Sequence, residues 1–233
     1  MKGLRICCYF YIFAIILFLS GCQSDFAVRN PPEEITVLDS QLSTALTIEE
    51  ICDNNADGVQ IIRSPETNLV SEIRGSFSKH MIFSETDALI ALGSVRNIMN
   101  ISDFSFCCSM IDKRTDSVVF SLAQVYKGVP VIGYGFRVGA SNDGTPLFVS
   151  GSFREDINTS VNPVINVNEC VKFLSLSNNE EISEAELVIY ANSDGEFLCW
   201  KYDITSDDPL RCRTICCDAT TGKIITTLLN AVA

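Results

Sequence analysis

Histidine is nearly absent from this 233-residue chain, and its scarcity limits the chemistry that the protein can perform. A zinc peptidase of the His-Glu-x-x-His type binds its metal through two histidines one helical turn apart, with the glutamate as base. The single histidine, His80, cannot supply that site. A cysteine–histidine hydrolase needs a thiol activated by the histidine, and no cysteine has a recognisable nucleophile context. We therefore predict no catalytic residue and no enzymatic activity.

Cys-x-x-Cys pairs, which often mark zinc sites, are also absent. The spacing Cys212-x-x-x-Cys216 alone is a weak metal signal, so we predict neither a metal nor a cofactor. Eight cysteines follow the N-terminal region, namely Cys52, Cys107, Cys108, Cys170, Cys199, Cys212, Cys216 and Cys217. Two adjacent pairs occur among them, and adjacent side chains in a strand point to opposite faces. Free buried thiols, one or two disulfides, and bound metal all stay open as interpretations.

Basic residues are few, with 17 Lys and Arg against 29 Asp and Glu, which gives a net charge of −12. An acidic protein repels nucleic-acid phosphates, so we predict no nucleic-acid partner. We interpret the charge as a means of keeping the surface soluble. The acidic pairs at 33–34, 49–50 and 180–181 fall in polar stretches, where solvated charge is a better interpretation than acid/base couples.

No apolar run reaches the roughly 20 residues that a bilayer-spanning helix needs. A short basic region precedes the apolar run Ile6 to Leu19, whose length is typical of a signal-peptide core. Leu19-Ser20-Gly21-Cys22 then matches the bacterial lipobox, which implies cleavage before Cys22 and diacylation of its thiol. An ordinary secretory signal and a membrane anchor with an incidental cysteine are the alternatives. We expect residues 1–21 to be a lipoprotein signal peptide and Cys22 to anchor the protein on the outer face of the cell membrane.

Residues 22–57 have the composition of a tether. They contain Asn30-Pro31-Pro32-Glu33-Glu34 and few aromatics. One short helix is expected near Thr47 to Asp53, because Thr47 and Glu50 have the spacing of a capping box.

Residues 58–156 predict an α+β unit. Two β-branched clusters around a polar loop predict a hairpin, and Ser84 is placed to cap an amphipathic helix that ends near Asn100. Four further strands, at 104–110, 118–125, 131–140 and 147–152, are expected to form an antiparallel meander against this helix. We expect Lys127 to Pro130 to break the sheet, because proline cannot donate to a ladder.

Residues 157–233 predict a second, smaller α+β unit. Asn166 or Asn168 is expected to cap a helix that runs to about Ser175. Four strands follow, at 186–190, 197–204, 210–217 and 223–229. The second of them carries Trp200, the only tryptophan.

Two groups of motifs carry a family resemblance. The run Gln124 to Gly135, which continues into Asp143 to Gly151, resembles the fungalysin/thermolysin propeptide (FTP) pattern Q-x-Y-K-G-V-P-V-x-G followed by D-G-x-x-x-x-V-x-G. The second unit resembles the PepSY module that follows FTP in thermolysin-type propeptides. The residues that carry this second likeness are Pro163, Ile165, Glu169, Leu198, Trp200, Tyr202, Ile204 and the run Asp218 to Ile225. Cys170 stands where family members often have alanine.

The resemblance implies two small units, each an antiparallel sheet packed on one helix, with a cystatin-like fold. Such propeptides occupy the cleft of a thermolysin-type (M4) zinc peptidase, inhibit it and guide its folding, and no such peptidase domain is present here. We therefore expect a lipid-anchored, extracytoplasmic binding module that inhibits a secreted zinc metallopeptidase, or assists its folding, in trans. A structural or sensory envelope lipoprotein that reuses the fold, and a truncated metallopeptidase precursor, are the alternatives. The expected partner-docking residues are Tyr126, Lys127, Gly128, Val129, Pro130, Val131, Asp218 and Gly222.

Overall fold

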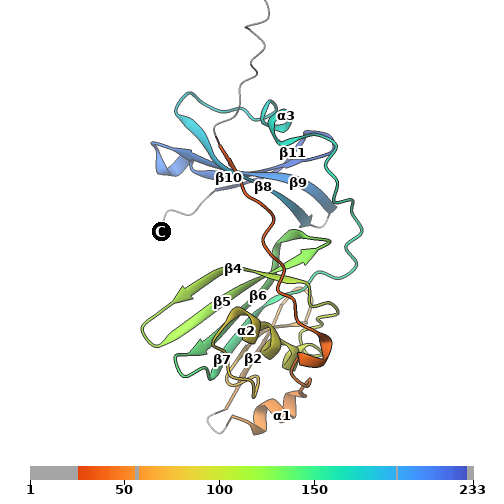
Figure 1. Ribbon diagram of the computed structural model, residues 1–233, viewed down its shortest axis with the longest axis vertical. Coiled ribbons are helices and arrows are strands. Elements are labelled where there is room, and N and C mark those ends of the chain that lie inside the picture. The colour runs from red at the N-terminus through yellow and green to blue at the C-terminus, as the bar shows by residue number, and fades with distance from the viewer. Residues whose placement is uncertain (1–25, 56–57, 193, 230–233) are drawn as a thin grey trace, which may run out of the picture.

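The structure is a computed structural model that describes residues 26–55, 58–192 and 194–229. Over these ranges the chain is a mixed α/β protein with a large sheet and a few short helices (Figure 1). Its eleven described strands join in one sheet, whose main path runs in the order β11-β10-β9-β8-β6-β7-β3-β2. Strands β1, β4 and β5 attach beside this path. The expectation of largely antiparallel strands with few helices is therefore confirmed in outline.

The first half-sheet, strands β2 to β7, comes from residues 60–152. Its members are β2 (Gln60–Arg63), β3 (Val70–Arg74), β4 (Phe106–Lys113), β5 (Ser117–Tyr126), β6 (Val129–Ser141) and β7 (Pro146–Ser152). All of its ladders are antiparallel. The predicted hairpin is β2–β3, and the predicted meander is β4 to β7.

The observed α-helix is shorter than the one that the apolar pattern from Ser84 to Asn100 predicts. The Ser84 side chain caps α2 (Glu85–Leu92) by accepting a hydrogen bond from the Asp87 backbone N–H. The chain then tightens into the 3₁₀ turn η3 (Gly93–Val95) and reaches Asn100, which has the left-handed φ of 55° expected for it. Glycine is a poor helix former, so the α-helix ends where Gly93 begins the tighter turn.

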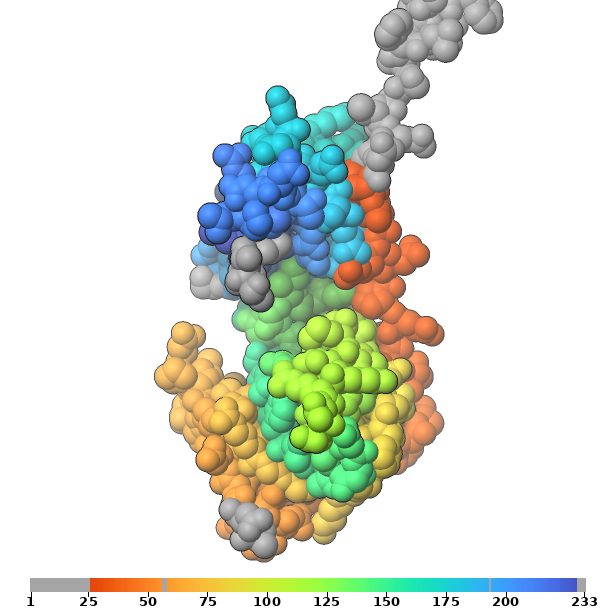
Figure 2. Space-filling view, turned by 90° about the vertical axis from the view of Figure 1, so that its left-hand side faces the viewer, coloured from red at the N-terminus to blue at the C-terminus, as the bar shows by residue number. Residues whose placement is uncertain are grey.

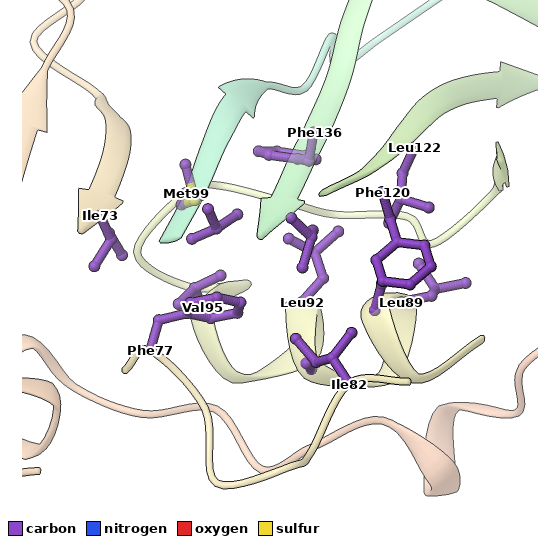
Figure 3. Packing of buried hydrophobic residues seen from close by; sticks show 14 of the residues in the cluster. Ile73, Phe77, Ile82, Leu89, Leu92, Val95, Met99, Phe120, Leu122 and Phe136 are labelled. Carbon is purple, nitrogen blue, oxygen red and sulfur yellow. The ribbon is translucent and has the colours of Figure 1, made fainter. Parts of the chain in front are cut away.

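The main hydrophobic core lies between α2 and the first half-sheet. Leu89 and Leu92 of the helix point toward Phe120, Leu122 and Phe136 of strands β5 and β6 (Figure 3). These five side chains are at most 2% exposed. Burying a large apolar side chain stabilises a fold by about 1.5–3 kcal/mol, so this layer is the main source of stability for residues 60–152.

The second half-sheet, strands β8 to β11, follows α3 (Val167–Val171). Its members are β8 (Glu180–Asn192), β9 (Gly195–Ser206), β10 (Arg213–Asp218) and β11 (Ile224–Leu229), with the 3₁₀ turn η4 (Pro209–Arg211) before β10. The helix is shorter than predicted and β8 begins six residues earlier. The strand expected at 210–217 starts only at Arg213, because Asp208 caps η4 by accepting from the Leu210 N–H.

Helix α3 packs on the face of the second half-sheet that points away from the first (Figure 1). Asn166, one of the two predicted caps, accepts a hydrogen bond from the Glu169 N–H, and Glu169 returns one to the Asn166 N–H. Two aromatic side chains of β9 hold the same segment. Trp200 Nε1 donates to the Ile165 carbonyl at 2.8 Å, and the Tyr202 hydroxyl donates to the Val167 carbonyl at 2.7 Å.

Strand β6 joins the two half-sheets. Its pairing with β5 jumps from Pro130 to Gly135, so residues 131–134 leave that ladder. Val131 and Ile132 pair instead with β8, in parallel. The division into two separate units is therefore not established, because one strand belongs to both halves.

The turn before β6 is tighter than predicted. Tyr126 of β5 pairs directly with Val129 of β6, so the turn between them contains only Lys127 and Gly128. These two residues have φ of 50° and 82° and form a two-residue hairpin turn. Pro130, which we expected to break the sheet, lies within β6 instead. Pro130 is the last residue paired with β5 before the ladder is interrupted, so its missing N–H lies where the pairing breaks.

Residues 26–55, for which the sequence predicts a tether, lie along both half-sheets (Figure 2). Strand β1 (Ala27–Val28) pairs in parallel with β8, and Glu34 bridges to Cys107 at the edge of β4. The segment continues through the 3₁₀ turn η2 (Asp39–Gln41) to α1 (Ile48–Asp53). The predicted capping box of Thr47 and Glu50 starts α1, whose Ile51 is fully buried in the main core.

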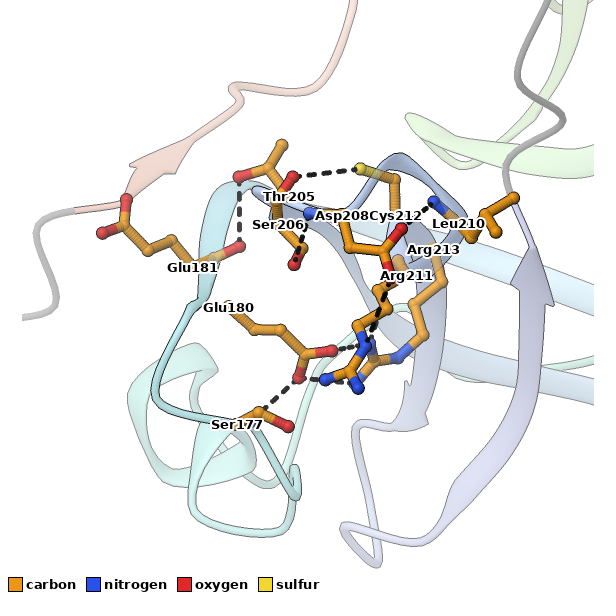
Figure 4. Close-up of polar contacts among 10 residues, drawn as sticks. All are labelled: Ser177, Glu180, Glu181, Thr205, Ser206, Asp208, Leu210, Arg211, Cys212 and Arg213. Atoms are coloured by element: carbon orange, nitrogen blue, oxygen red, sulfur yellow. Dashed lines mark hydrogen bonds and ion pairs between the residues drawn. The ribbon is translucent and has the colours of Figure 1, made fainter.

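A buried ion pair closes the end of the second half-sheet. Arg213 of β10 donates to both carboxylate oxygens of Glu180 at the start of β8, and the Ser177 N–H donates to the same carboxylate (Figure 4). The Glu180 side chain is only 4% exposed. The Arg213 guanidinium and the Ser177 N–H lower the pKa of Glu180 from 4.5 to about 2.

Replacing Glu180 with glutamine is expected to lower the urea midpoint of unfolding at pH 7 and to have little effect near pH 2. Because the folded pKa lies below the ordinary value, the charged pair stabilises the fold above about pH 4.5 and loses this effect as the pH falls toward 2. Urea titrations at several pH values measure it. The matched control is Glu181→Gln, since Glu181 is adjacent and exposed. Equal pH profiles for the two variants would contradict the assignment.

Candidate functional site

A cavity of about 710 Å³ lies beside the joint between the two half-sheets. We call it the joint groove. One wall comes from β4, β5, β6 and β7, and the other from β8 and β9, with Arg29 and Pro32 of the N-terminal segment at its rim. Its size falls in the range of clefts that bind ligands or peptide segments.

A charged network forms the wall from the second half-sheet. Glu186 of β8 accepts a hydrogen bond from Lys201 Nζ at 3.0 Å, and Arg29 lies 3.8 Å from the same carboxylate. Arg29 also binds Glu184 at 2.6 Å, and Lys201 lies 3.5 Å from Asp203. Burial acts to lower the pKa of Lys201, but the Glu186 carboxylate outweighs it and raises that pKa. On this wall, the positive charges of Arg29 and Lys201 are therefore balanced by nearby carboxylates.

The wall from the first half-sheet combines apolar residues, among them Leu122 and Phe136, with a few small polar ones. Arg137 of β6 lies opposite Ser121 on β5 and Ser150 on β7, and all three line the joint groove. The Arg137 side chain is exposed, and no described residue forms an ion pair or side-chain hydrogen bond with it. Arg137 is therefore a cation available to a bound anion.

Two cysteines of β4 also line the joint groove, and their environment disfavours the thiolate. Cys107 is fully buried, and burial followed by the nearby Glu186 carboxylate raises its pKa to about 11. Burial also raises the pKa of Cys108. A nucleophilic cysteine needs a lowered pKa, so these thiols have the properties of packing groups.

His80 lies at the N-terminus of α2, where it serves a local structure. Its Nε2 lies 3.1 Å from Asp87 Oδ1, and Asp87 also accepts from the Ser84 hydroxyl and the Phe83 N–H. These hydrogen bonds lower the pKa of Asp87, although its partial burial acts in the other direction. Over residues 26–55, 58–192 and 194–229, no three His, Cys, Asp or Glu side chains gather as metal ligands would.

The predicted docking run divides between surface and interior. Lys127 and Gly128 are exposed at the hairpin tip, and Tyr126 is half-buried. Val129, Pro130 and Val131 are buried. Val129 and Val131 pack with Ile157, Ile189, Leu198 and Ala219 in a cluster that belongs to both half-sheets. Most of this distinctive run therefore packs into an internal joint, and Pro130 and Val131 also line the joint groove.

The other predicted docking residues, Asp218 and Gly222, build a turn. Asp218 accepts hydrogen bonds from the backbone N–H groups of Thr220 and Thr221. Gly222 is buried, with φ of 77°, and a Cβ placed on it would lie 2.4 Å from the ring of Phe173. The predicted lipidation site, Cys22, lies outside the described residues.

Sequence reasoning missed the residues that give the joint groove its charge, which are Arg29, Arg137, Glu186 and Lys201. A signal was present for two of them. Glu186 and Lys201 directly adjoin apolar stretches of their strands, at 187–190 and 197–200, and charged residues that become buried usually have a partner. Nothing in the sequence indicated that Arg29, in the predicted tether, would reach β8.

No family model matches the chain, and no curated protein matches it. Among solved structures, the Bacillus megaterium YpeB C-terminal domain is similar, with 16% sequence identity and a TM-score of 0.41. The match covers 81% of this chain and 100% of that domain. A likeness at this level carries no argument about function, so the FTP and PepSY resemblance stays a prediction. No helix in the described ranges is long and apolar enough to span a membrane.

Proposed function

We propose that the protein is a lipid-anchored, extracytoplasmic binding module that docks on a secreted zinc metallopeptidase in trans and slows it or assists its folding. The class of partner comes from the propeptide-like motifs of the sequence. The anchor comes from the lipobox at Cys22. The observation that carries the docking surface is the joint groove, with its free cation at Arg137.

The joint groove suits an extended segment of a partner protein. It is bordered by strands on both sides, and residues 131–134 of β6 bulge out of the β5 ladder at its floor. Its small residues, among them Ser109, Ser121 and Gly151, leave room for a chain to lie against the strands. Backbone contacts of this kind give affinity, and side-chain pockets give specificity.

Charge favours a segment that carries a carboxylate. The chain as a whole has a net charge of −12. In the lining of the joint groove, Arg29 and Lys201 are already paired with carboxylates, whereas Arg137 has no ion-pair partner among the described residues. An arginine fork pairs well with a carboxylate, at up to two parallel hydrogen bonds. An acidic partner segment would therefore be drawn to this groove and repelled by most of the remaining surface.

Complex formation with a secreted thermolysin-type zinc peptidase tests the proposal. The full chain is expected to co-elute with the peptidase and to reduce its hydrolysis of a peptide substrate. Arg137→Glu is expected to weaken binding at least tenfold, since it reverses the free charge of the groove. The control is Lys127→Glu, an equal charge reversal at the exposed hairpin tip, which should leave binding within about twofold.

The control also separates two docking surfaces. A loss of binding with Lys127→Glu and not with Arg137→Glu would move the interface to the hairpin tip, as the sequence alone predicted. No complex and unchanged peptidase activity would contradict the proposal and favour a structural or sensory envelope protein.

A further inference from the structure

Two buried thiols of the second half-sheet lie in contact. The Sγ atom of Cys170 in α3 is 3.2 Å from the Sγ atom of Cys217 in β10, and both residues are fully buried. The two positions are 47 residues apart in the sequence. By contrast, the thiols of Cys107, Cys108 and Cys212 donate to backbone carbonyls.

The surrounding hydrogen bonds fix both thiols in this position. Cys170 follows the Asn166–Glu169 capping box, and the carbonyls of Ile165 and Val167 are held to β9 by Trp200 and Tyr202. On the other side, the backbone N–H groups of residues 164 and 165 both donate to the Ala219 carbonyl, in the turn that follows β10. These hydrogen bonds hold α3 against β9 and β10, and this position of the helix brings the two thiols into contact.

We propose that Cys170 and Cys217 are a disulfide-forming pair that links α3 covalently to β10. A disulfide bond is about 2.05 Å long, so the sulfurs must approach by about 1 Å to form it. The adjacent Cys216 cannot substitute, because it points to the opposite face of β10, where it packs with Val188 and Cys199.

The oxidant is a disulfide, either a small molecule such as oxidised glutathione or a thiol–disulfide carrier protein. One cysteine, as thiolate, attacks the oxidant and releases one thiol. The second then attacks the resulting mixed disulfide, forms the Cys170–Cys217 bond and releases the second thiol. Two electrons and two protons pass to the oxidant. Burial raises the pKa of both thiols, so exchange takes place while the five-residue α3 is undocked, during folding or local opening.

Peptide mapping under non-reducing conditions tests the link in the full chain. After unfolding and refolding with oxidised glutathione, free thiols are alkylated and the protein is digested with trypsin. Residues 155–172 and 214–223 each form one tryptic peptide and contain Cys170 and Cys217. We expect these two peptides to appear joined and to separate on reduction. The joined mass should lie about 2 Da below the sum of peptide 155–172 and peptide 214–223 with Cys216 alkylated.

Because Cys216 shares a peptide with Cys217, two variants assign the bond. The joined peptides are expected to persist in Cys216→Ser and to be lost in Cys217→Ser. Alkylated Cys170 in the refolded wild type, or a link that survives in Cys217→Ser, would overturn the proposal. The experiment uses neither an exported sample nor a peptidase, so its outcome is independent of the proposed function.

Discussion

Replacing Gly135 with alanine is expected to lower the free energy of unfolding by about 3 kcal/mol or to prevent folding. Gly135 has φ of 142°, in a region that side chains disfavour, and a Cβ there would lie 2.1 Å from the Leu122 carbonyl oxygen. Backbone atoms cannot move aside as the end of a flexible side chain can. Gly135 is the residue at which β6 pairs with β5 again after residues 131–134. The substitution would therefore disturb the strand pairing next to the joint between the half-sheets.

Gly133→Ala is the matched control, two residues away on the same strand. Gly133 also has positive φ, at 83°, but nothing lies within 4 Å of the added Cβ. We expect a loss of about 1 kcal/mol from backbone conformation alone. Urea unfolding followed by far-ultraviolet circular dichroism compares the two variants. Equal losses would show that the close approach at Gly135 is unimportant.

Replacing Val131 with aspartate is expected to lower the free energy of unfolding by about 4 kcal/mol, because a carboxylate would be buried without a partner. Val131 is 2% exposed and lies in the cluster shared by both half-sheets, opposite Ile189 of β8. The change should also uncouple the halves. Trp200, the only tryptophan, borders this cluster and reports on the second half-sheet.

In the wild type, we expect Trp200 fluorescence and circular dichroism to give coincident unfolding transitions. In Val131→Asp the two are expected to separate, which is a test of two-state behaviour. Lys127→Ala is the control, since its exposed side chain lies on the same hairpin, and it should change stability by less than about 0.5 kcal/mol. Coincident transitions and normal stability in Val131→Asp would contradict the conclusion that the cluster around Val131 couples the two half-sheets.

Local signals were read correctly from the sequence. Thr47, Ser84 and Asn166 each cap the helix assigned to them, because a cap depends on residues within one turn. Most strand positions also follow from β-branched and apolar runs bounded by turn residues. Strand ends were less accurate, as at β8, whose polar first residues gave no strand signal although Glu180 is buried by its pairing with Arg213.

Long-range pairing could not be predicted from the sequence. The parallel contact of β6 with β8 joins Val131 to Ile189, and neither residue carries a local sign of the other. For the same reason, the internal packing of Val129 and Val131 could not be predicted from the motif, which was interpreted as a partner surface. The joint groove depends on this pairing, so it too was invisible in the sequence.

Amide hydrogen exchange of the protein, alone and mixed with a secreted thermolysin-type zinc peptidase, measures whether the joint groove is the docking surface. We expect added protection in β4 and in residues 131–137 of β6, which line the joint groove. Lys127 and Gly128 at the hairpin tip should be unchanged. Protection confined to that tip and to the turn at Asp218 to Gly222, or no protection at all, would contradict the account.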